Sequence, residues 1–267
     1  MLGALVGDIV GSVYEWHNIK TTEFPLFSEK SMFTDDSVMT VAVAHAMLDC
    51  YDGQKVSQSG LVRLMRSYGR MYPDAGYGGR FRRWMKSYHP KPYNSYGNGS
   101  AMRVSPVAWV SDDLAQVEAL AKATSEVTHD HPEGIKGAQA VAACILMARQ
   151  GVENDEIRRY IEGRFEYDLE FTLDSIRPQY RFDVSCQGSV PQAIVAFLES
   201  SSFEDAVRLA VSIGGDSDTI AAITGSIAQG RYGIPDWIAE EAEKRLTEHL
   251  KSIQGLFCER YQVEGGK

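Results

Sequence analysis

Apolar residues recur at helical spacing along almost the whole 267-residue chain, and the alternation typical of strands is nearly absent. The spacing predicts helices over residues 3–15, 36–50, 57–70, 79–87, 100–109, 113–124, 132–149, 154–164, 190–200, 203–213, 218–229 and 235–253. Residues 165–184 carry aromatic and acidic side chains without a clear period. We expect a loop with a short helix there, which covers part of a site or packs on the core. The chain has no internal repeat or linker, so we predict a single all-α domain over residues 1–267.

Glycines mark one face of the first predicted helix. Gly3, Gly7 and Gly11 recur at every fourth position, and Glu15 continues the series. A glycine inside a helix costs about 1 kcal/mol relative to alanine, so three of them need a structural reason. We expect a neighbouring helix to approach the backbone closely. Asp8 and Glu15 share a face with Gly11, which suggests the floor of a cleft, and the alternative is that both acids face solvent.

The composition narrows the class of protein. A hydrophobic content of 44% with 24% charged residues is ordinary for a soluble globular protein. No apolar run reaches the roughly 20 residues of a membrane helix, and residues 1–8 lack the basic region of a signal peptide. The cysteines form no CxxC pair and are expected to be reduced thiols of a cytoplasmic protein: Cys50, Cys144, Cys186 and Cys258. We expect a monomer that does not bind membranes.

The charge distribution bears on nucleic acids as partners. The net charge of −9 argues against a nucleic acid bound through a general basic surface. Residues 80–83 (RFRR) form a local basic cluster, which is either a solvated helix face or part of a binding surface. A nucleic acid therefore enters only as a modified substrate.

Two acidic motifs, TDDS at 34–37 and GGDSDT at 214–219, each open a helix rich in small residues. Either motif alone is explained as a helix cap, because carboxylates and hydroxyls accept hydrogen bonds from free backbone N–H groups. Capping, however, needs one oxygen, and each motif offers two carboxylates and a threonine. Buried carboxylates repel one another unless a cation compensates. If the two helix starts converge, the all-oxygen ligand set favours Mg²⁺ or Mn²⁺ over Zn²⁺.

The motifs and their order resemble the ADP-ribosylglycohydrolase family, which includes the dinitrogenase-reductase-activating glycohydrolases. The matching segments run nearly end to end: 3–8, 11–15, 34–37, 76–79, 97–103, 128–129, 189–191 and 214–219. No single segment is decisive, but their combination is highly specific. The resemblance implies a compact orthogonal multi-helix bundle around a central two-metal cleft.

The resemblance also implies which residues bind metal and which act in catalysis. Two divalent cations, Mg²⁺ or Mn²⁺, would be held by Thr34, Asp35, Asp36, Asp216, Asp218 and Thr219. Glu15 matches the acidic residue of the family's cleft, and Glu15 and Asp36 are the candidate catalytic carboxylates. No serine or cysteine nucleophile signature competes with them.

The candidate substrate-binding residues fall in three segments. Gly76, Gly78 and Gly79 match a loop near the ADP-ribose phosphates, where a glycine-rich turn exposes N–H groups at a helix start. The second segment contributes Asn98, Gly99, Ser100 and Met102, and the third contributes His129. Each has a plainer interpretation as a turn, a turn with a cap, or a structural histidine. His131 and residues 187–189 match the family only loosely.

The implied activity is release of ADP-ribose from an ADP-ribosylated protein or small molecule. The preferred substrate is ADP-ribosyl-arginine or a related N-linked adduct. One alternative is a hydrolase of O-linked ADP-ribose, such as ADP-ribosyl-serine or O-acetyl-ADP-ribose. Another is a non-catalytic relative that only binds ADP-ribose. A non-catalytic relative is expected to lose metal ligands, whereas every ligand position is filled here.

Overall fold

A computed structural model describes residues 1–263, which form thirteen α-helices, two short 3-10 helices and no sheet. The α-helices are α1 (Leu2–Gly11), α2 (Asp35–Asp49), α3 (Gln58–Met71), α4 (Gly79–Lys86), α5 (Leu114–Ser125), α6 (Pro132–Arg149), α7 (Asn154–Phe165), α8 (Leu173–Ile176), α9 (Cys186–Glu199), α10 (Phe203–Ser212), α11 (Ser217–Tyr232), α12 (Asp236–Glu243) and α13 (Glu248–Tyr261). The 3-10 helices are η1 (Asn98–Ser100) and η2 (Ser105–Trp109). The all-α prediction is confirmed. A single domain over 1–267 stays a prediction, and its last four residues lie outside the described part.

Five of the predicted helices have wrong boundaries; one of these errors is that α11 continues to Tyr232, beyond the predicted end at residue 229. The helix predicted over 3–15 ends at Gly11, where the Ser12 hydroxyl donates a hydrogen bond to the carbonyl of Ile9. The helix predicted over 100–109 is replaced by η1 and η2. The one predicted over 235–253 divides into α12 and α13, because Thr247 caps a new helix by accepting a hydrogen bond from the N–H of Leu250.

The fifth error concerns α9, which was predicted to begin at residue 190, just before Pro191. The Ser185 hydroxyl accepts a hydrogen bond from the N–H of Gly188, so the helix begins earlier and Pro191 lies inside it. In contrast, α6 begins at Pro132 as predicted. The N–H that proline lacks would have no partner in the first turn of a helix.

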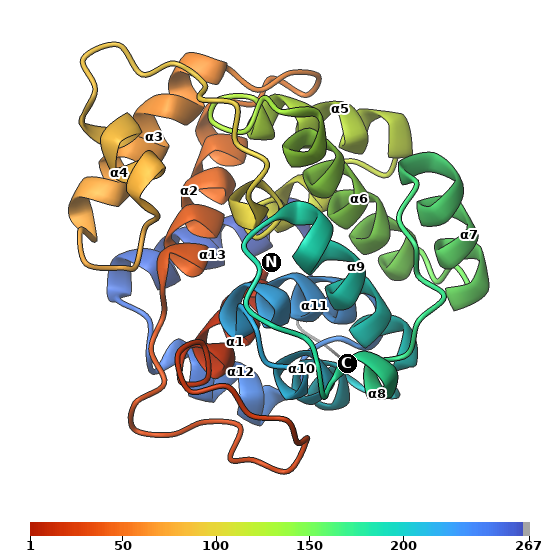
Figure 1. The fold of residues 1–267 in the computed structure, drawn as a ribbon. Coiled ribbons are helices and arrows are strands. Elements are labelled where there is room, and N and C mark those ends of the chain that lie inside the picture. The colour runs from red at the N-terminus through yellow and green to blue at the C-terminus, as the bar shows by residue number, and fades with distance from the viewer. Residues whose placement is uncertain (264–267) are drawn as a thin grey trace.

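Helix α11 lies at the centre of the molecule, with α1, α6, α9 and α10 packed around it (Figure 1). The backbones of α1 and α11 almost touch along the glycine face. A Cβ atom on Gly3, Gly7 or Gly11 would lie 2.2, 1.9 or 2.4 Å from backbone atoms of Gly225, Ala221 and Asp218, respectively. The expected close helix approach is therefore confirmed. It brings Asp8 of α1 beside the start of α11.

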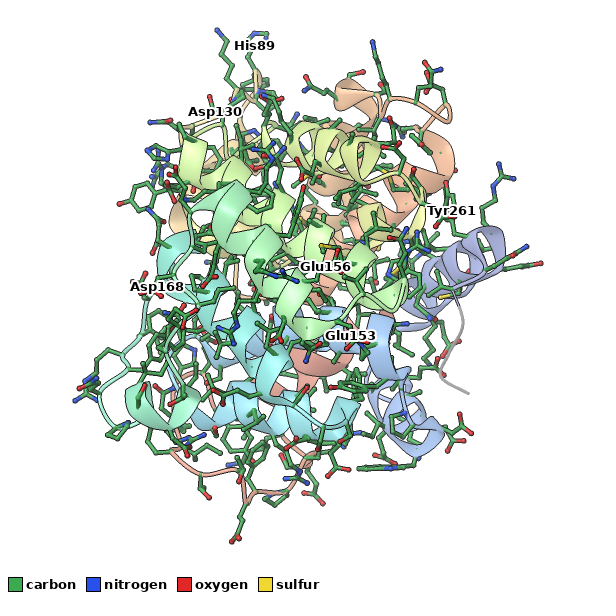
Figure 2. All side chains as sticks on the ribbon, turned by 90° about the vertical axis from the view of Figure 1, so that its right-hand side faces the viewer. His89, Asp130, Glu153, Glu156, Asp168 and Tyr261 are labelled. Carbon is green, nitrogen blue, oxygen red and sulfur yellow. The ribbon has the colours of Figure 1, made fainter. Side chains whose placement is uncertain are left out.

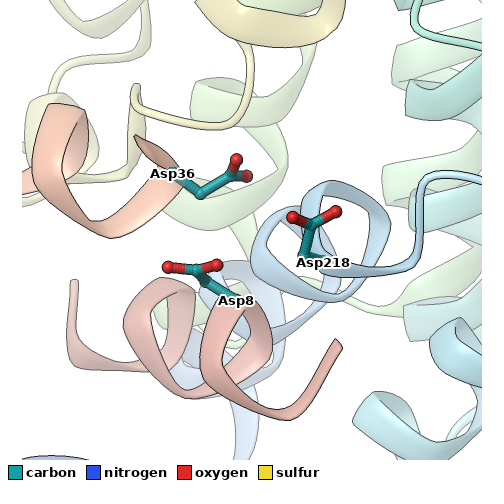
Figure 3. A group of neighbouring side chains, drawn as sticks. All are labelled: Asp8, Asp36 and Asp218. Carbon is teal, nitrogen blue, oxygen red and sulfur yellow. The ribbon is translucent and has the colours of Figure 1, made fainter. Parts of the chain in front are cut away.

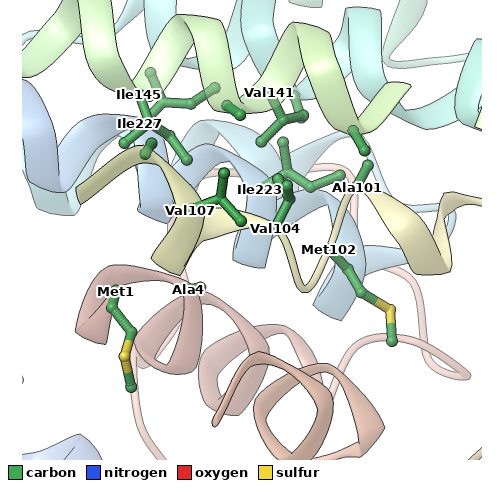
Figure 4. Close-up of a cluster of buried hydrophobic side chains, with 14 of the residues drawn as sticks. Met1, Ala4, Ala101, Met102, Val104, Val107, Val141, Ile145, Ile223 and Ile227 are labelled. Atoms are coloured by element: carbon green, nitrogen blue, oxygen red, sulfur yellow. The ribbon is translucent and has the colours of Figure 1, made fainter. Parts of the chain in front are cut away.

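The hydrophobic core lies between these central helices and η2. Buried side chains meet there from α1 (Met1, Ala4), the segment around η2 (Val104, Val107), α6 (Val141, Ile145) and α11 (Ile223, Ile227) (Figure 4). Charged residues such as Glu153 and Glu156 lie on the surface at the start of α7 (Figure 2). Most ion pairs among residues 1–263 join neighbours on one helix, and such exposed pairs contribute little. Burial of apolar surface therefore dominates the stability.

Two further observations concern the predicted class. Within residues 1–263, no helix is both long enough and apolar enough to cross a membrane. The cysteines at 50, 144, 186 and 258 are all free thiols, as expected from their spacing.

The close contact at Gly7 predicts that a larger residue at this position destabilises the fold. Gly7→Ala would place a methyl group 1.9 Å from the carbonyl oxygen of Ala221, so we expect a loss of about 3 kcal/mol in the free energy of unfolding. Gly163→Ala in α7 is the matched control, because nothing lies within 4 Å of its added Cβ. The control is expected to stabilise by up to about 1 kcal/mol. Urea unfolding of both variants measures the difference, and equal stabilities would contradict the prediction.

Candidate active site

A cleft with a cavity volume of about 500 Å³ opens at the start of α2 and α11. Of the residues predicted for the site, those that line it are Glu15, Thr34, Asp35, Asp36, Gly76, Gly78, Gly79, Asn98, Gly99, Met102, His129, Asp216, Asp218 and Thr219. Ser100 does not line it: this residue is buried, and its hydroxyl donates a 2.7 Å hydrogen bond to the carbonyl of Gly134. The prediction that Ser100 contacts substrate therefore does not fit its position.

Asp8 and Thr34 cap helix α2. The Asp8 carboxylate accepts hydrogen bonds from the N–H and hydroxyl of Thr34, at 2.9 and 2.7 Å, and from the N–H of Ser37, at 3.0 Å. It also accepts one from the Ser37 hydroxyl. The Thr34 hydroxyl in turn accepts a hydrogen bond from the N–H of Asp36. Because these two residues satisfy the free N–H groups, the Asp36 carboxylate is not needed as a cap.

The start of α11 is built differently. Asp216 is the N-cap residue, but its side chain makes no capping hydrogen bond. Its carboxylate instead accepts a 2.7 Å hydrogen bond from the side-chain amide of Asn98, which also donates to the Ser189 hydroxyl. Capping therefore explains the carboxylates of neither Asp36 nor Asp216. The Asn98 amide positions Asp216, a role that the sequence pattern did not indicate.

The carboxylates from α1, α2 and α11 point toward one another (Figure 3). Asp8, Asp36 and Asp218 each offer an oxygen within 4.8 Å of the others, and Glu15, Asp216 and Asp218 form a second such group. Burial, and then repulsion by Asp218 and Asp8, holds the pKa of Asp36 well above its usual range. Burial likewise raises the pKa of Asp216 to about 6. Without a cation, the surroundings therefore disfavour ionisation of these acids together, and the protonated forms are favoured.

One carboxylate oxygen has no hydrogen-bond partner. The Oδ1 atom of Asp36 is buried and unpaired, while its Oδ2 atom accepts a 3.3 Å hydrogen bond from the Thr219 hydroxyl. A buried, unpaired carboxylate oxygen is costly unless a cation binds it. The donors around it are all oxygen atoms, the ligands preferred by hard divalent cations. The residues present therefore fit a divalent cation site.

Glu15 reaches this group from a loop. Helix α1 ends at Gly11, so the predicted helix face shared by Asp8 and Glu15 is wrong for Glu15, and the solvent-facing alternative is wrong for Asp8, which is fully buried. The side chain of Asn18 fixes the loop: it donates to the carbonyls of Glu15 and Gly215, both at 2.9 Å, and accepts a 2.8 Å hydrogen bond from the N–H of Gly215. Gly215 has a φ of +77°, which favours glycine.

Glu15 also has an unusual titration. Burial, and then the charges of Asp218 and Asp8, raises the pKa of Glu15 to about 7, although a hydrogen bond from Trp16 partly opposes this. A carboxyl group with a pKa near neutrality is suited to move a proton. Asp35 lies beside it on the wall of the cleft, and burial holds its pKa well above the usual range.

The start of α4 and the loop before it also line the cleft, and they carry hydrogen-bond donors. Gly78 is the N-cap residue of α4 and has no side chain to satisfy the first N–H groups of the helix. Arg80 lines the cleft and lies over the ring of Tyr93, 5.1 Å from its centroid. Free N–H groups at a helix start together with an arginine form an anion-binding surface. The basic cluster at 80–83 is thus divided, since only Arg80 and Phe81 line the cleft.

A buried arginine supports the part of the cleft that is lined by Gly99 and His129. The Arg103 guanidinium donates hydrogen bonds to the carbonyl of Gly99 at 2.9 Å and to the Thr128 hydroxyl at 2.8 Å. Thr128 in turn contacts Nδ1 of His129 at 2.7 Å. Burial, and then the charges of Arg103 and Arg80, holds the pKa of His129 well below its usual range, so its imidazole is neutral.

The sequence reasoning missed five residues that take part in this site. Asp8 was considered as a cleft acid but not as the cap of α2, and Arg103 was seen only as the end of a motif. The other three line the cleft without belonging to any predicted motif: Trp16, Tyr93 and Phe182. The only signal for Phe182 was the aperiodic aromatic segment 165–184, which was expected to cover part of a site.

Comparisons with known proteins agree with this geometry. The sequence profile of the ADP-ribosylglycohydrolase family matches residues 1–265, so the chain belongs to this family of glycosyl-bond hydrolases. The chain is 26% identical over 313 residues to ADP-ribosylhydrolase ARH3 of Mus musculus, covering 88% of this chain and 83% of that protein. It is 27% identical over 192 residues to ADP-ribosylarginine hydrolase Tri1 of Pseudomonas putida (strain GB-1), covering 68% of this chain and 50% of that protein.

A solved structure supports the fold. It is described as an ADP-ribosylglycohydrolase-related protein complex and superposes with a TM-score of 0.74 at 22% identity, covering 98% of this chain and 96% of that one.

The buried acids predict how the stability of the metal-free protein depends on pH. Because the pKa values of Asp216 and Glu15 are raised to about 6 and about 7, the folded protein retains protons that the unfolded chain releases. Stability is therefore lost as pH rises through these values. We expect the Tm of the metal-free protein to be lower at about pH 8 than at about pH 6. Saturating Mg²⁺ or Mn²⁺ is expected to raise the Tm at the higher pH.

The control for this experiment is Asp218→Asn, which removes one buried charge from both groups of carboxylates. It is expected to flatten the pH dependence of the metal-free protein and to weaken the response to the cations. A wild-type Tm that rises from pH 6 to pH 8, or that does not respond to either cation, would contradict the prediction.

Asp8→Asn tests the cap of α2. Asparagine has one acceptor oxygen and an NH₂ group, which would face donors from Thr34 or Ser37. We expect a loss of about 2 kcal/mol in the free energy of unfolding and weaker Mn²⁺ binding by calorimetry. Asp52→Asn is the control, since Asp52 also accepts two backbone N–H groups but lies exposed in a turn. Unchanged stability and Mn²⁺ affinity of Asp8→Asn would show that the cap does not depend on the charge.

Proposed function

We propose that this protein is a metal-dependent hydrolase that releases ADP-ribose from an ADP-ribosylated acceptor, with ADP-ribosyl-arginine or a related N-linked adduct as substrate. One observation carries the proposal: two groups of carboxylates converge in a cleft that is also lined by the start of α4 and by Arg80, which supply hydrogen-bond donors. This arrangement matches a molecule that has anionic phosphates at one end and a ribose with vicinal hydroxyls at the other.

Two Mg²⁺ or Mn²⁺ ions are the proposed cofactors. Their proposed ligands are Thr34, Asp35, Asp36, Asp216, Asp218 and Thr219, and the unpaired Oδ1 atom of Asp36 supports this assignment. The Thr34 hydroxyl donates to Asp8 and accepts from the N–H of Asp36, so one acceptor lone pair remains for a metal ion. Bound divalent cations would supply charge stabilisation and a water of lowered pKa.

Glu15 and Asp36 are the proposed catalytic carboxylates. Hydrolysis of a glycosidic bond passes through a transition state with oxocarbenium character, and it requires one group to take a proton from water or to give one to the leaving group. Glu15 is suited to this, because its pKa is raised to about 7 and its side chain lines the cleft from a loop held by Asn18. A cation nearby would lower this pKa and favour the ionised form, which can act as a base.

The other walls orient the substrate in this proposal. The N–H groups of Gly78 and Gly79 and the guanidinium of Arg80 would bind the phosphates. Gly76, Gly99 and Met102 line the path of the sugar, and neutral His129 closes it. Asn98 acts by holding Asp216.

Substitution of the ligands tests the activity. Asp36→Ala and Asp218→Ala are each expected to lower kcat for ADP-ribose release from an ADP-ribosyl-arginine peptide by a factor on the order of 10³. The folded state is expected to persist, because removing one carboxylate relieves repulsion. Circular dichroism and Tm check the fold, and the assay is run with Mg²⁺, with Mn²⁺ and with EDTA.

Asp155→Ala, an exposed acid in the first turn of α7, is the matched control and should retain full activity. Release that continues in both ligand variants, or in EDTA, would overturn the metal-dependent mechanism. An ADP-ribosyl-serine peptide in parallel decides between the N-linked substrate and the O-linked alternative. We further propose a cytoplasmic monomer, a location supported by the free cysteines.

A further inference from the structure

Two exposed aromatic rings meet at the mouth of the cleft. Trp16, directly after Glu15, is 74% exposed, and Phe182, in the loop before α9, is 43% exposed. Their rings are stacked, with centroids 5.4 Å apart and planes inclined by 24°. Both side chains line the cleft. Aromatic surface left in water beside a binding cleft is typical of a site that a ligand covers.

The segments that carry the two rings are anchored on both sides. The Lys20 ammonium donates to the carbonyl of Tyr180 at 2.9 Å, which ties the segment after Trp16 to the segment before Phe182. On the other side, the N–H of Asn98 donates to the carbonyl of Val184 at 2.8 Å. The rings therefore belong to a built rim of the cleft rather than to free loops.

The charges of the residues that line the cleft indicate which part of the substrate lies at this rim. The phosphates of ADP-ribose belong beside Arg80 and the N-terminus of α4, because the two groups of carboxylates repel them. The bond to be broken then lies by the carboxylates, and the acceptor extends past Glu15. The next side chain along the rim is that of Trp16, which follows Glu15 in the chain and also lines the cleft.

We propose that Trp16 and Phe182 form the acceptor subsite of the cleft and that it binds the planar guanidinium of an ADP-ribosylated arginine. This inference rests on the proposed function. An indole ring attracts a cation over its face, and a guanidinium also stacks on aromatic rings. The Glu15 carboxylate adds an acceptor for its N–H groups. A serine acceptor has no planar cation, so the pair offers it only non-specific apolar contact.

Substitutions at Trp16 separate the acceptor from the ADP-ribose moiety. We expect Trp16→Ala to lower kcat/KM for an ADP-ribosyl-arginine peptide about fivefold. The Kd of free ADP-ribose, measured by calorimetry on the metal-loaded protein, should change by less than about twofold, and kcat/KM for an ADP-ribosyl-serine peptide should fall less than that for the arginine peptide. Trp16→Phe keeps an aromatic ring but removes the indole N–H, and it should retain most of the arginine selectivity.

Trp237→Ala is the matched control. Trp237 is similarly exposed, at 49%, and packs on an aromatic neighbour, Phe27, but belongs to α12 and does not line the cleft. It should leave all three measurements unchanged.

Three results would overturn the inference. Equal losses for ADP-ribose and the arginine peptide would place the pair on the ADP-ribose moiety. An unchanged kcat/KM in Trp16→Ala would show that the rim does not bind the acceptor. Equal defects in Trp16→Phe and Trp16→Ala would show that Trp16 acts through its indole N–H and not through stacking of its ring.

Failure of the proposed function gives a different result, which is absence of turnover by the wild type. In that case, the Kd of the intact arginine peptide can be measured directly. The inference then expects this peptide to bind more tightly than ADP-ribose to the wild type but not to Trp16→Ala. Equal affinities in the wild type would overturn it. Wild-type turnover of the serine adduct alone would also overturn it, while leaving the hydrolase assignment intact.

Discussion

The backbone contact between α1 and α11 is the interaction on which the rest of the site depends. Gly7 and Gly11 remove the side chains that would separate the two helices, so their backbones meet. This contact places Asp8 next to Asp218 and leaves its carboxylate free to cap α2. The start of α2 is thereby fixed against the start of α11, and the acids of two distant motifs share one cleft.

The same arrangement brings several acidic side chains together where water is largely excluded. Burial and mutual repulsion raise the pKa values of the acids, and one oxygen of Asp36 lacks a partner. A fold selected only for stability would avoid such a group. The stable surroundings, with a core of α1, α6 and α11 below the cleft, offset this cost. In the proposed function, binding of cations is the physical reason for keeping the acids together.

Much of the fold could be predicted from the sequence, because most helices have both a clear apolar period and a side chain that marks their start. Pro132 and Ser202 are two such markers, and α6 and α10 begin where they indicate. The errors fall where local signals compete. Ser185 rather than Pro191 determines the start of α9, and the loop after α1 has no period, so the position of Glu15 could not be derived from a helix face. The partners of Asn98 and the stacking of Trp16 on Phe182 join distant segments, and no local pattern predicts them.

The sequence by itself determined the all-helical class, the glycine face of α1 and the placement of acids at two helix starts. Each of these follows from spacing along the chain, which local periodicity records. Only the tertiary structure decided which of the acidic and hydroxyl oxygens are still available to bind a metal ion. Asp8 and Thr34 use theirs to cap α2, Asp216 is held by Asn98, and Asp36 keeps one oxygen unpaired. The physical reason is that a carboxylate can be assigned to a metal only after its hydrogen bonds are known, and these bonds come from segments far apart in the sequence.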